Sequence, residues 1–140
     1  MSTRADNYTQ LKTNPVLFSD FLDNLDLNPI TGAIARATNE KSIAQALKNL
    51  VLTNYGERLF QPNVGCNTMA TLFEPNDIVA QEDLKYHITT TIKQNEPRVN
   101  LIEVDVKSNQ LQDSLAVSIT YVIINTSQIQ SINLILARLR

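Results

Sequence analysis

The side chains that could act as nucleophile, general base or metal ligand are few in this chain. Its only histidine is His87 and its only cysteine is Cys66. One histidine cannot build a histidine-rich metal site, and a catalytic histidine would need a nucleophile or carboxylate brought beside it by the fold. A Cys66–His87 pair stays open on sequence alone, but a small buried apolar role for Cys66 is favoured. We therefore expect no catalytic residue, no bound metal and no cofactor.

Paired carboxylates are the other route to catalysis, because two of them can cleave a glycosidic bond. Glu57, Glu74 and Glu96 are the candidates, since each lies beside a predicted loop boundary. Sugar-binding clefts usually carry aromatic side chains, yet the chain has no tryptophan and only 6% aromatic residues. Its three glycines are not clustered into a phosphate-binding loop. The residue inventory favours a protein that is not an enzyme, with a small cell-wall hydrolase as the alternative.

The segment Glu96-Pro97-Arg98 places a rigid proline between opposite charges. Arginine can make forked contacts to carboxylates that lysine cannot reproduce. One interpretation is a connector between a helix and a strand, held by an internal salt bridge, and physics alone favours it. The other is a docking point for a neighbouring subunit.

Length and charge limit the class of protein further. A chain of 140 residues suits one domain with a real core. Its net charge is -2 with no basic run, so nucleic-acid binding is disfavoured. No apolar stretch approaches the length of a membrane span, and residues 1–10 lack the apolar core of a signal peptide. We expect a flexible or partner-ordered arm over residues 1–15 and a single domain over 16–140, made in a cytoplasm or assembled there into a particle.

Two helices are predicted to position these residues. The first runs from about Asn39, a good N-cap, to Asn54, with Gly56 just past its end. The second begins near Asn76 or Asp77 and stops before Pro97. Apolar residues at helical spacing predict the buried side of each helix: Ile43, Leu47, Leu50 and Val51, with Ala46, in the first, and Ile78, Leu84, Ile88 and Ile92 in the second.

Less regular segments surround these helices. Residues 16–27 form either a short helix or an extended segment, and Thr31-Gly32 is a turn. Residues 57–61 suggest a short strand, followed by a loop.

A run of strands completes the chain. Val99 and Leu101 are predicted on one face of the first strand, with Ile102, Val104 and Val106 on the other. A turn at Ser108-Asn109, an alternating strand at 115–122, a turn at 125–127 and a last strand at 132–136 follow. Helices first and an antiparallel β-meander last predict an α+β fold.

Several motifs in this order resemble one protein family. Residues 56–65 read GERLFQPNVG, residues 72–75 read LFEP, and a predicted helix ends in EPRV at 96–99. The sequence is similar to the baseplate wedge and sheath-initiator proteins of contractile phage tails, which have relatives in type-six secretion baseplates and extracellular injection particles. The resemblance covers roughly residue 20 to the C-terminus, and some members of the family carry an older lysozyme-like label.

The resemblance implies a structural role in the virion tail baseplate. It gives Glu96, Pro97 and Arg98 a partner-binding role, and it makes a structural motif of Gly56, Glu57, Arg58, Phe60, Pro62 and Gly65. The implied partners are other wedge subunits, the tail sheath protein and tail tube proteins, with no nucleic acid and no membrane. The subunit would join the wedge and nucleate the sheath around the tube.

The closing strands, 116–125 and 128–136, suggest how a partner would bind. Residues 115–130 contain no charge and no proline, the features that usually guard a sheet edge. We expect a sheath subunit to add a strand there, with Glu96-Pro97-Arg98 fixing the angle of the sheet. Reversing the charge of Arg98 is then expected to leave a folded protein that does not enter baseplates. An adaptor or chaperone that visits the particle without staying in it is a third hypothesis.

Overall fold

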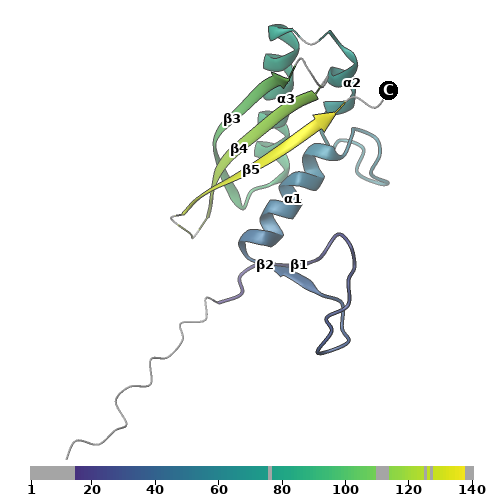
Figure 1. Cartoon of the computed structure of the whole chain (residues 1–140), viewed down its shortest axis with the longest axis vertical. Coiled ribbons are helices and arrows are strands. Elements are labelled where there is room, and N and C mark those ends of the chain that lie inside the picture. The colour runs from purple at the N-terminus through teal and green to yellow at the C-terminus, as the bar shows by residue number, and fades with distance from the viewer. Residues whose placement is uncertain (1–14, 76, 110–113, 125, 127, 138–140) are drawn as a thin grey trace, which may run out of the picture.

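A computed structural model of the chain describes residues 15–75, 77–109, 114–124, 126 and 128–137. The predicted arm lies outside these residues apart from Pro15. Three helices precede a three-stranded antiparallel sheet, so the predicted α+β fold is confirmed, and a small two-stranded sheet comes before them (Figure 1). The elements in chain order are β1 (Ser19–Phe21), β2 (Arg36–Thr38), α1 (Glu40–Leu52), α2 (Thr68–Phe73), α3 (Ile78–Asn95), β3 (Val99–Asn109), β4 (Ser114–Ile123) and β5 (Ile129–Ala137).

Helix α1 follows its predicted apolar stripe, because Ile43, Leu47 and Val51 are all fully buried. The residue at its N-cap, Asn39, does not cap the helix with its side chain as the sequence predicted. Asn39 makes no side-chain capping bond. Its Oδ1 instead accepts hydrogen bonds from the backbone N–H groups of Leu17 at 2.8 Å and Phe18 at 3.3 Å. Asn39 therefore ties the N-terminal segment to the start of α1.

Helix α3 begins where the sequence predicts, with Asp77 as its N-cap accepting from the Ala80 N–H at 2.9 Å. Leu84, Ile88 and Ile92 are fully buried, but Ile78 is 77% exposed. The prediction for Ile78 was wrong because a four-residue step back from Leu84 leads to Ala80, which is the buried residue of the first turn.

The main sheet has the order β3-β4-β5, with β4 in the middle. A β-bulge at Ile102 shifts the register, since Leu101 pairs with Tyr121 while Glu103 pairs with Thr120. Val99 and Leu101 consequently share the covered face with Val104 and Val106, and the predicted split between two faces was wrong.

Of the two turns predicted around β4, one is wrong and the other lies partly outside the described residues. Ser108 and Asn109 belong to β3, where they pair with Leu115 and Ser114, so the turn predicted there was wrong. The connection from β3 to β4 runs through 110–113, outside the described residues, as do Asn125 and Ser127 of the second predicted turn.

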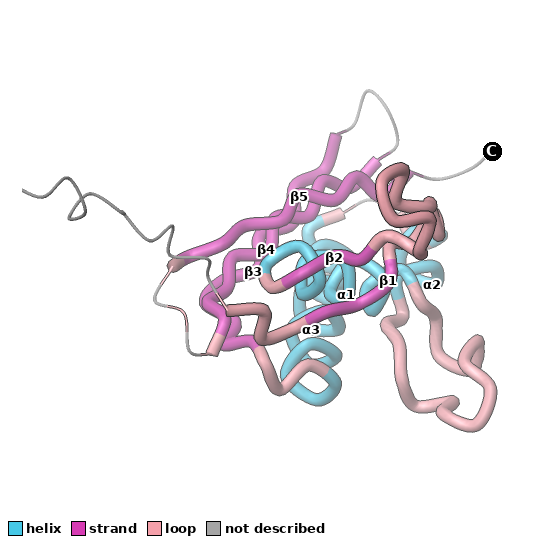
Figure 2. The backbone as a smooth tube through the Cα atoms, turned by 90° about the horizontal axis from the view of Figure 1, so that it is seen from below, coloured by secondary structure: helices cyan, strands magenta, loops and turns pink. Residues whose placement is uncertain are grey.

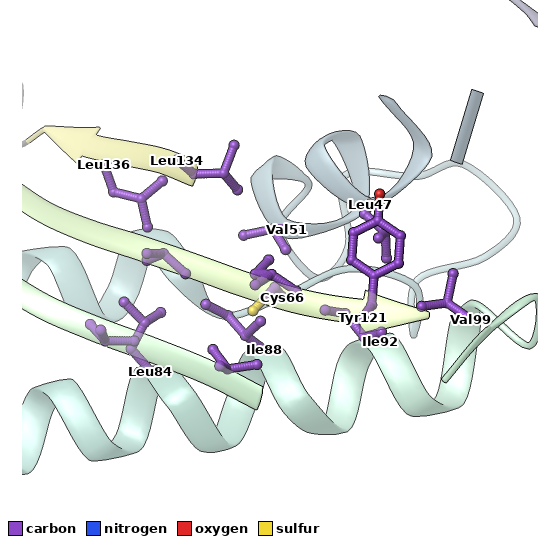
Figure 3. Close-up of a cluster of buried hydrophobic side chains, with 14 of the residues drawn as sticks. Leu47, Val51, Cys66, Leu84, Ile88, Ile92, Val99, Tyr121, Leu134 and Leu136 are labelled. Carbon is purple, nitrogen blue, oxygen red and sulfur yellow. The ribbon is translucent and has the colours of Figure 1, made fainter. Parts of the chain in front are cut away.

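The hydrophobic core lies between the helices and one face of this sheet (Figure 3). The alternating residues of β4 reach it as predicted, and Cys66 is a fully buried member of it. The core residues that Figure 3 labels are Leu47, Val51, Cys66, Leu84, Ile88, Ile92, Val99, Tyr121, Leu134 and Leu136.

The N-terminal segment is extended and folds into the β1–β2 hairpin beside α1 (Figure 2). Ser19 pairs with Thr38 and Phe21 with Arg36. The predicted turn at Thr31-Gly32 is confirmed, because Gly32 takes a φ of 67° and its N–H donates to the Asn28 carbonyl. Within the described residues, no helix has the length and apolar character needed to cross a membrane.

Candidate functional site

The Glu96-Pro97-Arg98 motif folds onto itself at the C-terminal end of α3. The Arg98 Nε and Nη2 atoms each donate to a different oxygen of Glu96, both at 2.6 Å. The Glu96 side chain is only 8% exposed, and that of Arg98 is 36% exposed. This hydrogen bonding to Glu96 raises the pKa of Arg98 above its ordinary value, against a smaller opposing effect of burial. The internal salt bridge favoured from the sequence is therefore present.

The N-terminal segment covers this ion pair. The Arg98 guanidinium lies 5.5 Å from the centre of the Phe18 ring, within the range of a cation–π interaction. The charge of Asp20 also contributes to the raised pKa of Arg98. Sequence reasoning missed Phe18 and Asp20, because a contact across 80 residues leaves no local pattern.

The GERLFQPNVG motif forms a compact loop between α1 and α2, not the short strand predicted for 57–61. Both oxygens of Glu57 accept from Asn54, one from its backbone N–H at 2.8 Å and one from its side-chain amide at 2.9 Å. These bonds lower the pKa of Glu57. The Gly56 N–H also donates to the Pro62 carbonyl at 2.9 Å, and Phe60 has a φ of 66° that no strand could accommodate.

Gly65 has a steric role in this loop. A Cβ atom there would lie 2.7 Å from the Thr53 carbonyl oxygen and 2.8 Å from the Asn54 carbonyl carbon. Only glycine allows the two ends of the loop to approach this closely.

The two motifs, far apart in the sequence, face one groove of about 850 Å³. Glu57 and Arg58 come from the loop, while Glu96 and Arg98 come from the end of α3. We call it the motif groove, and its lining residues are Asp20, Ala46, Asn49, Leu50, Thr53, Glu57, Arg58, Gln61, Val64, Gln94, Asn95, Glu96 and Arg98. Amides and charges predominate, so the motif groove suits a polar protein segment better than an apolar ligand.

Three of the residues considered for catalysis, Glu57, Cys66 and Glu96, are held in ways that do not suit a catalytic role. Cys66 is fully buried in the core, and both oxygens of Glu96 are occupied by Arg98. The pKa of Glu57 is lowered, which is opposite to the requirement of a general acid. Glu74 does not line the motif groove. No group of three or more potential metal ligands gathers among the described residues.

A second candidate surface is the edge of the sheet. Of the two closing strands expected to leave an edge, the segment 116–125 lies in the central strand β4, where the prediction was wrong, and the segment 128–136 lies in the edge strand, where it is confirmed. β5 is the edge strand, and its sequence IQSINLILA contains neither charge nor proline. The opposite edge, β3, carries Glu103, Asp105 and Lys107, and the last two form an exposed ion pair at 2.8 Å.

Comparison with known proteins identifies the family of this chain. A sequence model of the family described as baseplate wedge protein gp25 matches residues 37–128. This chain belongs to the baseplate wedge protein gp25 family. The matched segment includes the Gly56–Gly65 loop and the Glu96–Arg98 motif, while the β1 strand and β5 lie outside it.

One curated relative carries the same description. The baseplate wedge protein gp25 of Enterobacteria phage T4 is 29% identical over 105 residues, which are 74% of this chain and 80% of the relative. Membership in this family of structural proteins makes the chain a baseplate wedge component of the gp25 kind.

Solved structures share the fold at lower identity. A Geobacter sulfurreducens protein described as a candidate tail lysozyme has a TM-score of 0.69 at 19% identity, covering 77% of this chain and 98% of that one. A chain of the anti-feeding prophage baseplate has a TM-score of 0.62 at 18% identity, covering 86% and 85%. A chain of the type VI secretion system baseplate complex has a TM-score of 0.57 at 12% identity, covering 71% and 93%.

Proposed function

We propose that this chain is a non-enzymatic wedge subunit of a contractile-tail baseplate that offers its β5 edge to a sheath subunit. The observation that carries the proposal is the uncharged edge strand. Soluble proteins usually protect such an edge with charge, proline or a bulge, and β5 has no charge and no proline. A strand added there would gain main-chain hydrogen bonds along its length.

The Glu96-Pro97-Arg98 turn supports this function by fixing the direction in which the sheet leaves the helices. The ion pair closes the short turn from α3 to β3, and the Arg98 N–H also approaches Glu96 Oε1 at 3.4 Å. Since the sheet follows immediately after this turn, a rigid turn sets the angle at which the sheet leaves the helices. Neighbouring wedge subunits would contact the motif groove, where Arg58, Gln61 and Gln94 offer polar groups.

A lysine on the edge strand tests the proposed strand addition. Ile135 is 75% exposed and pairs with Ala116, so Ile135→Lys leaves the core intact. We expect a folded protein that enters baseplates but starts no sheath, because the lysine discourages pairing at this edge. Electron microscopy of particles from cells that produce only the variant would count sheathed tails.

The matched control is Asn100→Lys on the opposite edge. Asn100 is exposed and pairs with Val122, so its side chain lies on the same face of the sheet as Ile135. This control is expected to give normal sheaths. Normal sheath formation by Ile135→Lys would refute strand addition at β5.

The similarity to a candidate tail lysozyme raises a hydrolase as the second function. Glu57 and Glu96 line one groove, but their hydrogen bonds to Asn54 and Arg98 argue against a protonated acid beside a free carboxylate. We expect purified protein to clear no peptidoglycan. Clearing that disappears in Glu57→Gln, Glu74→Gln or Glu96→Gln would contradict the structural function.

Mass spectrometry of purified particles tests the third hypothesis, an adaptor or chaperone. A permanent subunit is found in the particles, whereas a visiting chaperone is absent from them.

A further inference from the structure

The tip of the loop in the gp25-family motif exposes two large apolar side chains to solvent. Leu59 is 79% exposed and Phe60 is 96% exposed, and no large hydrophobic side chain among the described residues is more exposed than Phe60. In Figure 1 this loop stands out from the body beside the C-terminal end of α1. Exposed aromatic side chains of this kind are typical anchors of protein interfaces.

The backbone at Phe60 takes an unfavourable conformation to present this ring. Its φ of 66° is in the left-handed region, which bulky residues rarely adopt. A glycine or asparagine would relieve the strain, and nothing inside the described chain buries the ring in return. Strain of this kind persists where the surrounding structure imposes it, commonly at binding sites.

The surrounding loop holds the tip in place from both sides. The Cys66 N–H donates to the Thr53 carbonyl at 2.7 Å, and the Thr91 hydroxyl donates to the Gly65 carbonyl at 3.0 Å. Nearer the tip, the Gln61 N–H donates to the Arg58 carbonyl at 3.2 Å. With the Asn54–Glu57 bonds, these contacts present Leu59 and Phe60 in one conformation. Such preorganisation lowers the entropic cost of binding.

The charge beside the tip indicates the chemistry of its partner. Glu57 is engaged by Asn54, whereas the Arg58 guanidinium makes no hydrogen bond or ion pair with any part of the chain that the structure describes. A pocket that receives the tip would therefore be apolar inside, with a carboxylate at its rim to pair with Arg58.

We propose that Leu59 and Phe60 form a preorganised anchor that inserts into an apolar, acid-rimmed pocket of a neighbouring baseplate subunit. The inference rests on the proposed function and goes beyond it, because it names a contact surface separate from β5. The anchor lies in the segment that matches the wedge family and next to the motif groove. We assign its partner to the wedge because Arg58 and Gln61, on either side of the tip, line the motif groove that we propose other wedge subunits contact.

The variant Phe60→Asn tests the binding role of the ring without disturbing the fold. Asparagine tolerates a positive φ, so we expect an unchanged or higher melting temperature. Loss of the anchor is expected to lower the amount of this protein in purified baseplates by about tenfold or more. Tyr86→Gln, which removes another exposed aromatic ring from α3, is the control and should change neither quantity.

A crosslinking experiment identifies the contact. Phe60→p-benzoylphenylalanine in assembled particles should give a covalent adduct with another baseplate subunit at an apolar peptide near a carboxylate, and the same substitution at Tyr86 should not. Wild-type abundance of Phe60→Asn in baseplates, or an adduct between two copies of this chain, would overturn the inference. Absence of the wild-type protein from particles would instead overturn the proposed function.

Discussion

The buried carboxylate of Glu96 receives hydrogen bonds on both oxygens from one guanidinium, and the two charges act as a unit. The sequence correctly indicated this salt bridge, since the two residues flank a proline. It could not indicate the 8% exposure of Glu96 or the Phe18 ring over Arg98. Both depend on segments brought together only by folding.

This burial changes the expected effect of reversing the charge of Arg98. Arg98→Glu places a second carboxylate against a buried one, so it should lower the free energy of unfolding by about 2 kcal/mol, discounted for the partial exposure of Arg98. The folded but non-assembling protein expected from the sequence is therefore replaced by a destabilised one. Urea unfolding measures the difference, with Arg36→Glu at an exposed position of β2 as the control. Equal stability of Arg98→Glu and wild type would contradict this account of the ion pair.

Gly65 makes a second prediction at this scale. Gly65→Ala should cost about 2 kcal/mol or more, because its Cβ would meet backbone atoms at 2.7 and 2.8 Å. Gly56 also has a positive φ, 84° against 141° for Gly65, but a Cβ there meets nothing within 4 Å, so Gly56→Ala should cost only about 1 kcal/mol. Thermal unfolding of the two variants compares them, and equal losses would argue against the steric role of Gly65.

The Asn54–Glu57 contact makes a prediction about pH. The pKa of Glu57 lies below its ordinary value of 4.5, so the contact is complete above that pH and is lost as the pH falls through the lowered pKa. An NMR titration should give Glu57 a midpoint below 4.5, and Asn54→Ala should return it toward that value. A midpoint at or above 4.5 in the wild type would contradict the contact.

At the scale of elements, strong periodicity allowed correct prediction. α1, α3 and β4 each bury one regular stripe, and these stripes follow from helical or strand spacing alone. The six-residue α2 was missed because six residues make fewer than two helical turns, too few for a repeating apolar stripe. The bulge at Ile102 and the positive φ of Phe60 each break a local pattern that otherwise resembles a simple strand. Edge and central strands also cannot be told apart until the pairing order is known.

The hairpin gives a prediction about how elements meet. Phe18→Ala should remove the ring from Arg98, shift the NMR signal of its Nε–H, and lower stability by about 1 kcal/mol. Phe21→Ala is the matched control, because the Phe21 ring lies 5.7 Å from a different guanidinium, that of Arg36. This variant should leave the Arg98 signal unchanged. An unchanged Arg98 signal in Phe18→Ala would show that the hairpin does not hold this side chain.

At the scale of the whole molecule, the chain offers two different surfaces. The motif groove and the Leu59-Phe60 tip are polar and apolar parts of one region built by α1, the loop, the end of α3 and β1. The edge strand β5 belongs to the sheet and depends on backbone pairing. A wedge subunit that joins the baseplate through one surface and the sheath through the other needs both. The sequence pointed to the closing strands as one surface, whereas the Leu59-Phe60 tip depends on a loop conformation that no local pattern indicated.

A cryo-electron microscopy reconstruction of the assembled particle would show whether a strand is added at β5. We predict that a strand from a neighbouring sheath subunit extends the sheet at β5, residues 129–137, as a fourth antiparallel or parallel strand. A β5 edge that faces solvent, or that is covered without backbone pairing, would contradict it.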